Sequence, residues 1–420
     1  MHPRRRFMLT GLGSLLALTS GCKPIRIWNP CHERLPQELL DHPLVRGVWH
    51  DIDPEKYWDC HLHIAGTGDS GSGITLAPEM TSLWHPFQNL QRHFYLNAGC
   101  ADSESGSVDK QYIDRLLDLM SAFPPGAKVM LFAFDRAHDE AGHSLPERSA
   151  FYVPNAYARA LAERHPSRFE WVASIHPYRS DAVAALEEAY DQGARAVKWL
   201  PPAMGIDPAS PRCQPFYQAM ARLGVPLITH AGEEKAVHGM NQTTFGNPLR
   251  LRRALDNGVR TVIAHCASIG EDEDFDHTNR HVPSFTLFTR LMENPAHRDL
   301  LHGDISAITL RNRDPAVVRT LLERTEWHPR LLNGSDYPLP GILPLISPTR
   351  FVKADLLDEK VVPVLNQMRE YHPLLADLLL KRHLSVHGTG FSPRIFETRD
   401  FFVPRRHTSG TTAQVAQSVA

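Results

Sequence analysis

The chain has 420 residues, of which 42% are hydrophobic, and its formal net charge is −2. This length allows one large domain or two ordinary ones, and the apolar content is sufficient for a packed core. The nearly neutral charge, without a basic stripe interleaved with aromatic residues, argues against a nucleic-acid partner. The six cysteines include no Cys-x-x-Cys pair, which argues against a zinc knuckle or a dense disulfide framework and leaves room for one disulfide of unknown pairing.

Residues 1–21 have the features of an export signal. Three arginines precede an apolar run, residues 7–18, that is far too short to span a bilayer. Two of these arginines followed by Phe-Met resemble the twin-arginine signal, and Leu-Thr-Ser-Gly before Cys22 resembles a lipobox, in which the cysteine is lipidated and becomes the mature N-terminus. An ordinary cleaved secretory peptide is the alternative. We therefore expect an exported, periplasmic protein that contacts the membrane only through a lipid on Cys22.

Residues 22–55 show no clear periodicity, and we interpret them as a tether that leads into the folded domain. From residue 56 to 402, short apolar runs alternate with amphipathic helical patterns, which is typical of a parallel sheet with helical crossovers. Eight such runs predict an α/β fold, a (β/α)8 TIM barrel with its active site at the C-terminal ends of the strands. The predicted strands are residues 57–63, 128–134, 170–175, 194–200, 226–229, 261–264, 300–305 and 330–333.

Start signals mark several of the helices between these strands. Asn247 and Asp314 each precede a proline, so each can cap a helix whose first residue is that proline. The apolar residues of segment 110–123 recur at helical spacing and predict one buried stripe. A long helical stretch, residues 361–380, is expected to close the barrel. Residues 403–420, rich in Ser, Thr, Gln and Ala, are expected to form a flexible tail.

Histidine and aspartate residues recur where the predicted strands end. The first strand ends in Asp-Cys-His61-Leu-His63, and strict alternation would put its Asp and both His on one face. The fifth, sixth and eighth strands run into His230, His265 and Asp336. Any one of these histidines, taken alone, is better explained as a core residue. Because the strand ends meet at one mouth, their joint placement predicts a site of three His and one carboxylate for zinc or another divalent metal.

Four further residues follow or interrupt the apolar runs. Lys198 lies within the fourth run, where burying its charge is costly. It is either an ammonium that reaches the barrel mouth or pairs with an acid, or a carboxylated lysine that bridges two metal ions. His176 and Asp304, at the ends of the third and seventh strands, are candidates for lining the pocket or binding substrate. Arg136, after the second strand, is a candidate for binding a substrate carboxylate.

Five motifs occur in a fixed order: Asp59-x-His61-x-His63, Lys198 in Val-Lys-Trp-Leu-Pro, Thr229-His230-Ala231-Gly232, Ala264-His265-Cys266 and Gly334-Ser335-Asp336-Tyr337-Pro338. Together they resemble the amidohydrolase superfamily, and most closely its amidohydrolase-related branch of metal-dependent TIM-barrel hydrolases. The resemblance extends over residues 56–395. It implies that His61, His63, His230 and Asp336 hold a metal. It also implies that His265 acts beside this metal as a general acid or base, or as a ligand of a second metal.

These expectations define a reaction class. One divalent cation per chain, most simply zinc, would activate water against an amide, lactone or ester bond of a small-molecule substrate. Asp336 would accept a proton from that water, and His265 would stabilise the developing oxyanion or relay a proton. Two metals per chain are expected only if Lys198 is carboxylated. The sequence gives no information on the oligomeric state.

Two other functions are compatible with the same residues. The branch also contains metal-dependent, non-oxidative decarboxylases, but such enzymes are usually cytoplasmic, so the export signal argues against this function. A non-catalytic, metal-binding lipoprotein is the other alternative, and the complete set of expected ligands argues against it.

Overall fold

Eight parallel strands form the core of the chain in this computed structural model, which describes residues 27–277 and 280–403. All eight overlap the strands predicted from the sequence. The predicted export signal with Cys22 and the tail beyond residue 403 lie outside the described residues. The eight strands are β1 (Trp58–His63), β3 (Lys128–Phe132), β5 (Phe169–Val172), β6 (Val197–Trp199), β7 (Leu227–Thr229), β8 (Thr261–Ile263), β11 (Leu301–Asp304) and β12 (Leu331–Leu332).

The strands close into a barrel. They pair in the orders β1-β3-β5 and β6-β7-β8-β11-β12, and every pair is parallel. Isolated parallel bridges between Ala173 and Val197 and between Leu62 and Tyr337 join the two groups at both edges. The backbone N–H of Cys60 also donates to the carbonyl of Asn333 at 3.0 Å. The (β/α)8 TIM-barrel prediction is therefore confirmed.

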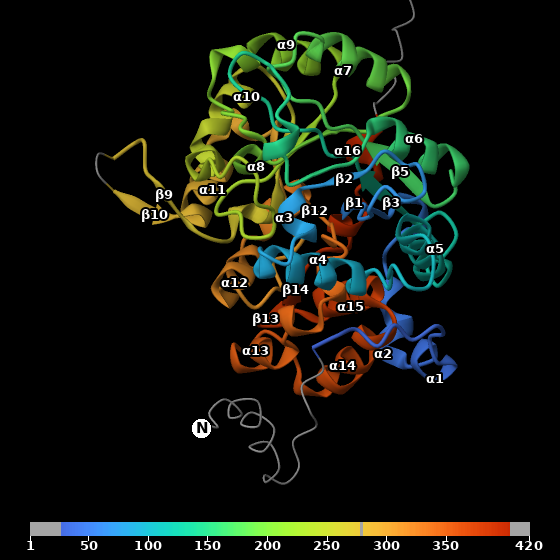
Figure 1. Ribbon diagram of the computed structural model, residues 1–420. Helices are drawn as coiled ribbons and strands as arrows, with labels where there is room; N and C mark the ends of the chain where they lie inside the picture. Colours follow the sequence, from blue (N-terminus) through green and yellow to red (C-terminus); the bar gives the residue numbers. More distant parts are fainter. Residues whose placement is uncertain (1–26, 278–279, 404–420) are drawn as a thin grey trace, which may run out of the picture.

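Helices surround the barrel, one or more in each crossover (Figure 1). The stripe predicted in segment 110–123 is buried in α5, whose N-terminus is capped by Ser107 through a bond from the Lys110 N–H. Asp314 caps α12 as predicted. The crossover helices are α5 (Val108–Ser121), α6 (Asn155–Arg164), α7 (Ala182–Asp191), α8 (Pro201–Met204), α9 (Gln214–Leu223), α10 (Arg252–Asp256), α11 (Ser284–Glu293) and α12 (Pro315–Glu323); α13 (Pro348–Lys353), α14 (Val362–Tyr371), α15 (Pro373–His383) and α16 (Arg399–Phe402) follow β12.

The long helix predicted over residues 361–380 is broken into α14 and α15. Pro373 has no N–H to donate and disfavours a helical conformation in the residue before it, so the break falls at His372. The His372 ring then caps the new helix, because its Nδ1 accepts the N–H of Leu375 at 3.0 Å.

Strand β1 does not alternate as predicted. Cys60 packs inside the barrel with Met130 and Phe132, whereas Leu62 packs outside, and the pairing register with β3 shifts between Asp59 and Leu62. Such an irregularity lets two successive side chains point to the same side of a sheet. Both Cys60 and His61 therefore face the barrel interior.

Residues 27–56, which include most of the predicted tether, lie against the barrel and contain two short helices, α1 (Gln37–Leu40) and α2 (Pro43–Arg46). A disulfide joins Cys31 to Cys100. The amide of Asn29 donates to the carbonyl of Gly341 at 3.1 Å. This segment is therefore held to the folded domain by both covalent and polar contacts.

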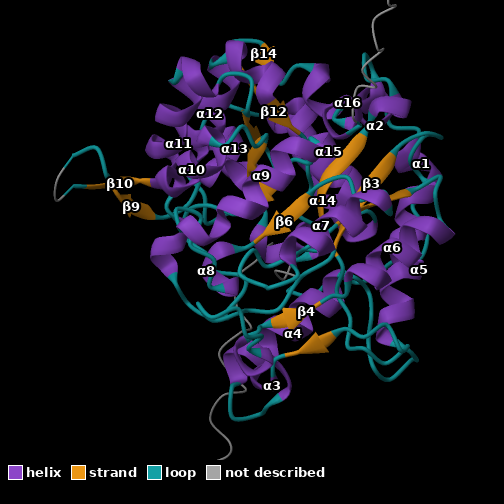
Figure 2. Cartoon of the chain, turned by 90° about the horizontal axis from the view of Figure 1, so that it is seen from above, coloured by secondary structure: helices purple, strands orange, loops and turns teal. Residues whose placement is uncertain are grey.

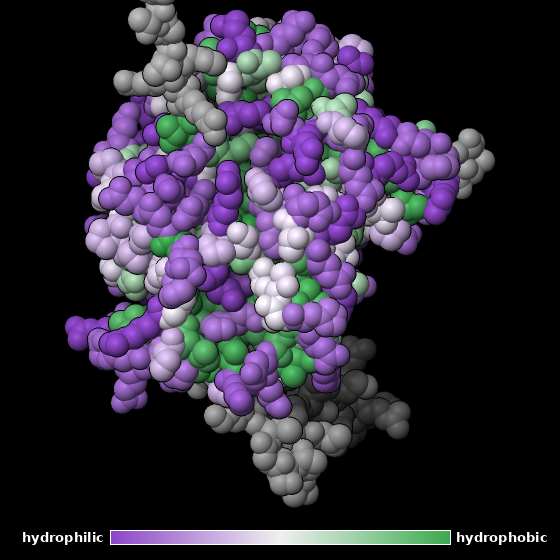
Figure 3. All heavy atoms as spheres, turned by 180° about the vertical axis from the view of Figure 1, so that it is seen from behind, coloured by the Kyte–Doolittle hydropathy of each residue, from purple (hydrophilic) through white to green (hydrophobic). Residues whose placement is uncertain are grey.

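The C-terminal mouth of the barrel is covered by α3 (Pro78–Thr81), α4 (Pro86–Ala98) and the antiparallel pair of β2 (Thr75–Leu76) with β4 (Phe151–Tyr152). Seen from above, α3, α4 and β4 gather at one end of the molecule (Figure 2). The face turned away from the viewer in Figure 1 is largely hydrophilic, with apolar residues gathered low on it (Figure 3). Two further antiparallel pairs lie at the periphery: β9 (Glu271–Glu273) with β10 (His281–Pro283), and β13 (Ser385–Val386) with β14 (Thr389–Gly390). Among the described residues, none of the helices has the length and apolar character needed to cross a membrane.

Candidate metal centre

His61, His63 and Asp336 meet at the mouth of the barrel. One potential ligand atom from each lies within 4.8 Å of the other two. Oδ1 of Asp336 is 3.4 Å from Nε2 of His61 and 3.4 Å from Nε2 of His63. The loop after β12 comes this close because residue 334 is glycine: a Cβ there would lie 2.4 Å from Cβ of His61. Three of the residues predicted to hold the metal thus form a compact candidate site.

The loop that carries Asp336 is tied to β1 by a buried network. Oδ1 of Asp59 accepts the N–H groups of Ser335 at 2.8 Å and of His61 at 3.2 Å. Behind it, the buried Lys381 of α15 donates to the carbonyl of Gly334 at 2.6 Å. Burial raises the pKa of Asp59 to about 7, despite these hydrogen bonds. Asp59 therefore holds the backbone of the candidate ligands and does not face the metal site.

Asp304, at the end of β11, orients two of the histidines. Its Oδ2 lies 2.8 Å from Nδ1 of His61, and its Oδ1 accepts the backbone N–H of His265 at 2.9 Å. His265, His61 and Asp304 also form a group whose potential ligand atoms lie within 4.8 Å of one another. With its Nδ1 engaged by a carboxylate, His61 presents Nε2 to the site, which is the usual arrangement behind a metal-binding histidine.

His265 follows β8 on a backbone with positive φ (55°). Its Nδ1 lies 2.7 Å from the hydroxyl of Ser306 and 3.2 Å from the Ser306 carbonyl. Its Nε2 is therefore directed toward Asp336, whose Oδ2 is 3.8 Å away. The predicted catalytic pair of His265 and Asp336 is thus brought together in the structure.

His230, at the end of β7, is outside both groups of candidate ligands but lies beside His265. Its ring centroid is 5.5 Å from that of His265. Its Nδ1 is one of the buried side-chain nitrogens that have no hydrogen-bond partner among the described residues, and the nearest acid, Glu234, is 3.4 Å away without hydrogen-bonding geometry. A buried, unpartnered imidazole nitrogen is costly in a protein interior unless something else binds it. A divalent cation fits this donor set.

Of the further residues that the sequence predicts, Lys198 lies at the site and His176 does not. Lys198 is fully buried beside the site, with Nζ 3.1 Å from Nε2 of His61, and burial lowers its pKa to about 8. His176 is not brought to the site: its Nε2 lies 3.1 Å from the carbonyl of Met204, and its Nδ1 accepts the N–H of Tyr178. Strand β5 ends at Val172, three residues earlier than predicted, so His176 lies in the following loop and both its ring nitrogens bond the backbone.

The protonation states suit a divalent cation. Burial lowers the pKa of His61 and of His265 well below the usual value, and it also lowers that of His230, so these rings are neutral near pH 7. Burial alone would raise the pKa of Asp336, but the neighbouring His61, His63 and Lys198 outweigh this effect and keep this carboxyl ionised. Neutral imidazoles and an ionised carboxylate are the forms that bind metal.

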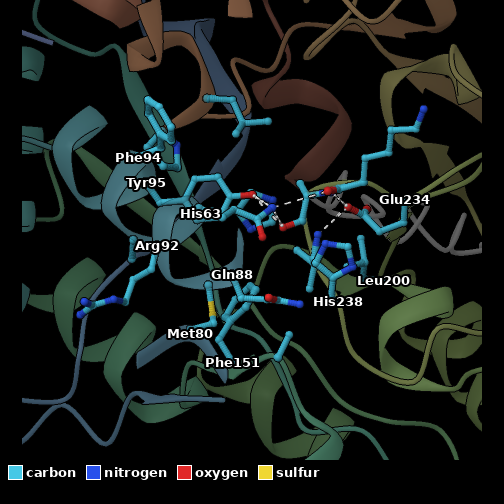
Figure 4. A pocket seen from close by; sticks show the side chains of 18 of the residues that line it. His63, Met80, Gln88, Arg92, Phe94, Tyr95, Phe151, Leu200, Glu234 and His238 are labelled. Carbon is cyan, nitrogen blue, oxygen red and sulfur yellow. Dashed lines mark hydrogen bonds between the residues drawn. The ribbon is translucent and has the colours of Figure 1, made fainter. Parts of the chain in front are cut away.

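The site lies at the bottom of a cavity of about 660 Å³. In Figure 4, Phe94 and Tyr95 of α4 stand on one side of the cavity and Glu234 on the other, with His63 between them. Much of the wall is apolar, which is usual for a pocket that takes an organic molecule. The apolar wall residues are Ile64, Ile74, Leu76, Met80, Phe87, Leu90, Phe94, Phe151, Val153, Leu200, Leu310, Leu339, Ile342 and Leu345.

Sequence reasoning did not identify two parts of this site. The helix α4 carries no metal-binding motif, and its role as a wall of the cavity follows only from its position over the mouth. Arg313 lines the cavity with its guanidinium buried, but the sequence Arg-Asn-Arg reads as an exposed loop. By contrast, Arg136 stacks on the ring of Tyr152 at 4.1 Å and is not among the residues that line the cavity.

The sequence profile of the amidohydrolase family matches residues 58–363. Among solved structures, an uncharacterised TIM-barrel protein from Bordetella bronchiseptica is 17% identical, with a TM-score of 0.43 over 76% of this chain and 99% of that one. 5-Carboxyvanillate decarboxylase from Sphingomonas paucimobilis is 11% identical, with a TM-score of 0.45 over 82% of this chain and 98% of that one. 4-Oxalomesaconate hydratase from Rhodopseudomonas palustris is 13% identical, with a TM-score of 0.40 over 82% and 95% of the two chains. The comparison with curated proteins finds no match.

Proposed function

This chain belongs to the amidohydrolase family, and we propose that it is a metal-dependent hydrolase that cleaves an amide, lactone or ester bond of a small molecule. The observation that carries the proposal is the meeting of His61, His63 and an ionised Asp336 at the bottom of an apolar cavity. A carboxylate next to neutral imidazoles in a water-accessible cavity suits a step in which water loses a proton as it attacks.

His61, His63, His230 and Asp336 would hold one divalent cation, most simply zinc, because imidazole nitrogens and carboxylate oxygens are ligands that zinc accepts. When bound, such a cation lowers the pKa of water toward neutrality and polarises a carbonyl group. Asp304 would keep the His61 ring in the tautomer that offers Nε2 to the metal.

The remaining steps belong to Asp336 and His265. Asp336, ionised in the resting protein, would accept the proton that the attacking water releases. His265 is neutral, and a proton on its Nδ1 can be donated to the carbonyl of Ser306, 3.2 Å away. Its Nε2 then faces Asp336 at 3.8 Å, where it can take that proton and pass it to the leaving group.

We further propose that the protein is exported and held at the membrane by a lipid on Cys22. The disulfide between Cys31 and Cys100 supports export, because disulfides persist in oxidising compartments. Next to the cavity, the turn before α4 exposes 87% of Leu83 and 91% of Trp84, and apolar side chains exposed in this way are compatible with a membrane nearby.

The proposal can be tested with zinc-loaded protein that begins after Cys22, incubated with panels of amides, lactones and esters in water enriched in 18O. We expect chelator-sensitive products that carry one 18O atom, and loss of turnover in Asp336→Asn, whose side chain cannot accept the proton. Asp358→Asn, the same change at an exposed aspartate that does not line the cavity, is the matched control. Release of carbon dioxide without 18O incorporation into the organic product would instead assign the chain to the decarboxylases.

A further inference from the structure

Arg313 lies in the loop between β11 and α12 and lines the same cavity as His265 and Asp336. Only 7% of the residue is exposed. Its Nη1 donates to the hydroxyl of Ser268 at 2.7 Å, and its Nε is buried without a partner. Among the described residues, no carboxylate forms an ion pair with its guanidinium.

A buried guanidinium without an anionic partner is unusual, because desolvating a charge is costly unless it is paired. Burial lowers the pKa of Arg313, and the acids that oppose this effect, Asp336, Glu234 and Asp304, act on it only at a distance. Glu234 is already engaged, since its Oε1 accepts the backbone N–H groups of Ala236 and Val237. A divalent cation in the site would add positive charge close to Arg313 and increase the need for an anion.

The position of Arg313 is fixed by its surroundings. Its backbone N–H donates to the carbonyl of Leu310 at 3.1 Å, and Arg350 donates to its carbonyl oxygen. Ser268 follows His265 by three residues and donates its own N–H to the His265 carbonyl at 3.0 Å. The guanidinium is therefore held at a constant place relative to His265, as a binding group should be.

We propose that Arg313 binds an acidic group of the substrate, so that the substrate is an amphiphile with one carboxylate near the reacting bond and an apolar body. Phe87, Leu90 and Phe94 of α4 offer the wall against which an acyl or aryl body would lie. The planar guanidinium presents paired N–H donors that match a carboxylate. The identity of the cleaved bond depends on the proposed function, whereas the binding of the anion does not depend on it.

The test is calorimetric titration of metal-loaded protein with 4-phenylbutyrate and with 4-phenylbutyramide, which has the same shape and no charge. The variants are Arg313→Gln, Arg313→Lys and Arg311→Gln, a matched control at an exposed arginine two residues away. We expect the native protein to prefer the acid at least tenfold and Arg313→Gln to abolish that preference, since a hydrogen bond to a charged group contributes about this much. Arg313→Lys should keep part of the preference, and Arg311→Gln should keep all of it.

The proposal is overturned if Arg313→Gln binds the acid as tightly as the native protein does, because the carboxylate would then be held by the metal alone. It is also overturned if the native protein binds both compounds equally or binds neither. Binding is measured without turnover, so a chain that hydrolyses nothing but shows the Arg313-dependent preference would contradict the proposed function and leave this inference standing.

Discussion

Oδ2 of Asp304 lies 2.8 Å from Nδ1 of His61, and both side chains are fully buried. The pair brings the end of β11 to the end of β1, on the far side of His61 from Asp336. It gives His61 one orientation, with Nε2 toward the candidate site. A carboxylate in this place is what sets the tautomer and basicity of a metal-binding histidine.

Asp304→Asn should therefore weaken metal binding without unfolding the protein. The amide oxygen can still accept the N–H of His265, but the charge that supports His61 is lost. We expect the dissociation constant for zinc, measured by competition with a chromophoric chelator, to rise about 10- to 100-fold. The exposed Asp299→Asn is the control, and an unchanged affinity in Asp304→Asn would show that the pair plays no part in metal binding.

The chemical state of Lys198, free amine or carboxylated, distinguishes a site with one metal per chain from a site with two. Its Nζ lies 3.1 Å from Nε2 of His61, and its pKa of about 8 leaves part of it as the neutral amine that reacts with carbon dioxide. In the one-metal account it stays an amine. Lys198→Gln should then leave the metal content, determined at pH 8 with bicarbonate, at one per chain. A fall from two to one in the variant would establish a carboxylated lysine.

Much of this site could be predicted from the sequence for two physical reasons. Apolar runs alternating with amphipathic segments predict the barrel, and in a barrel the residues that follow the strands must converge. The prediction that His61, His63, His230 and Asp336 hold a metal rests on this convergence, and the structure brings His61, His63 and Asp336 together. The convergence of the strand ends also points to His265 and Asp304. It does not reveal that Asp304 orients His61 and His265.

The remaining features depend on distances that a sequence does not contain. His176 was placed at a strand end, but β5 is shorter than its apolar run and leaves that ring in a loop. Arg311 and Arg313 lie in the same loop, and only the structure shows that Arg313 is buried beside the candidate metal site. The pairing of Cys31 with Cys100 required the packing of residues 27–56 on the barrel.

This disulfide should stabilise the chain. It closes a loop of 69 residues, and the entropy that such a cross-link removes from the unfolded chain corresponds to about 4 kcal/mol. Replacing both Cys31 and Cys100 by Ser should lower the free energy of unfolding in urea by up to this amount. The same double variant should be insensitive to a reductant that destabilises the native protein. The account of this bond is wrong if alkylation under denaturing conditions finds both thiols free in protein that was folded under oxidising conditions.

His372 should make the protein less stable in mild acid. Both ring nitrogens are engaged in the neutral form, Nε2 with the carbonyl of Leu119 at 2.8 Å and Nδ1 with the N–H of Leu375. Burial lowers its pKa to about 4, below the unfolded value of 6.5. The stabilising contribution is therefore complete above pH 6.5 and decreases as the pH falls, by about 3 kcal/mol at pH 4.

The test is urea unfolding between pH 7.5 and pH 4. His372→Gln should lose less stability over this range than the native protein, because glutamine does not titrate. His143→Gln, at an exposed position, should follow the native pH dependence. Identical pH dependence in His372→Gln and the native protein would rule out protonation of this ring as a cause of acid destabilisation.

Metal content tests the central claim most directly. Protein that begins after Cys22 and is purified without chelator would be analysed by plasma mass spectrometry, alongside His230→Ala and Asp336→Asn. We predict about one zinc or other divalent cation per chain in the native protein and a marked loss in both variants, because three imidazoles and one carboxylate form the site. Native protein that holds no metal, even after incubation with zinc or manganese, would contradict the account.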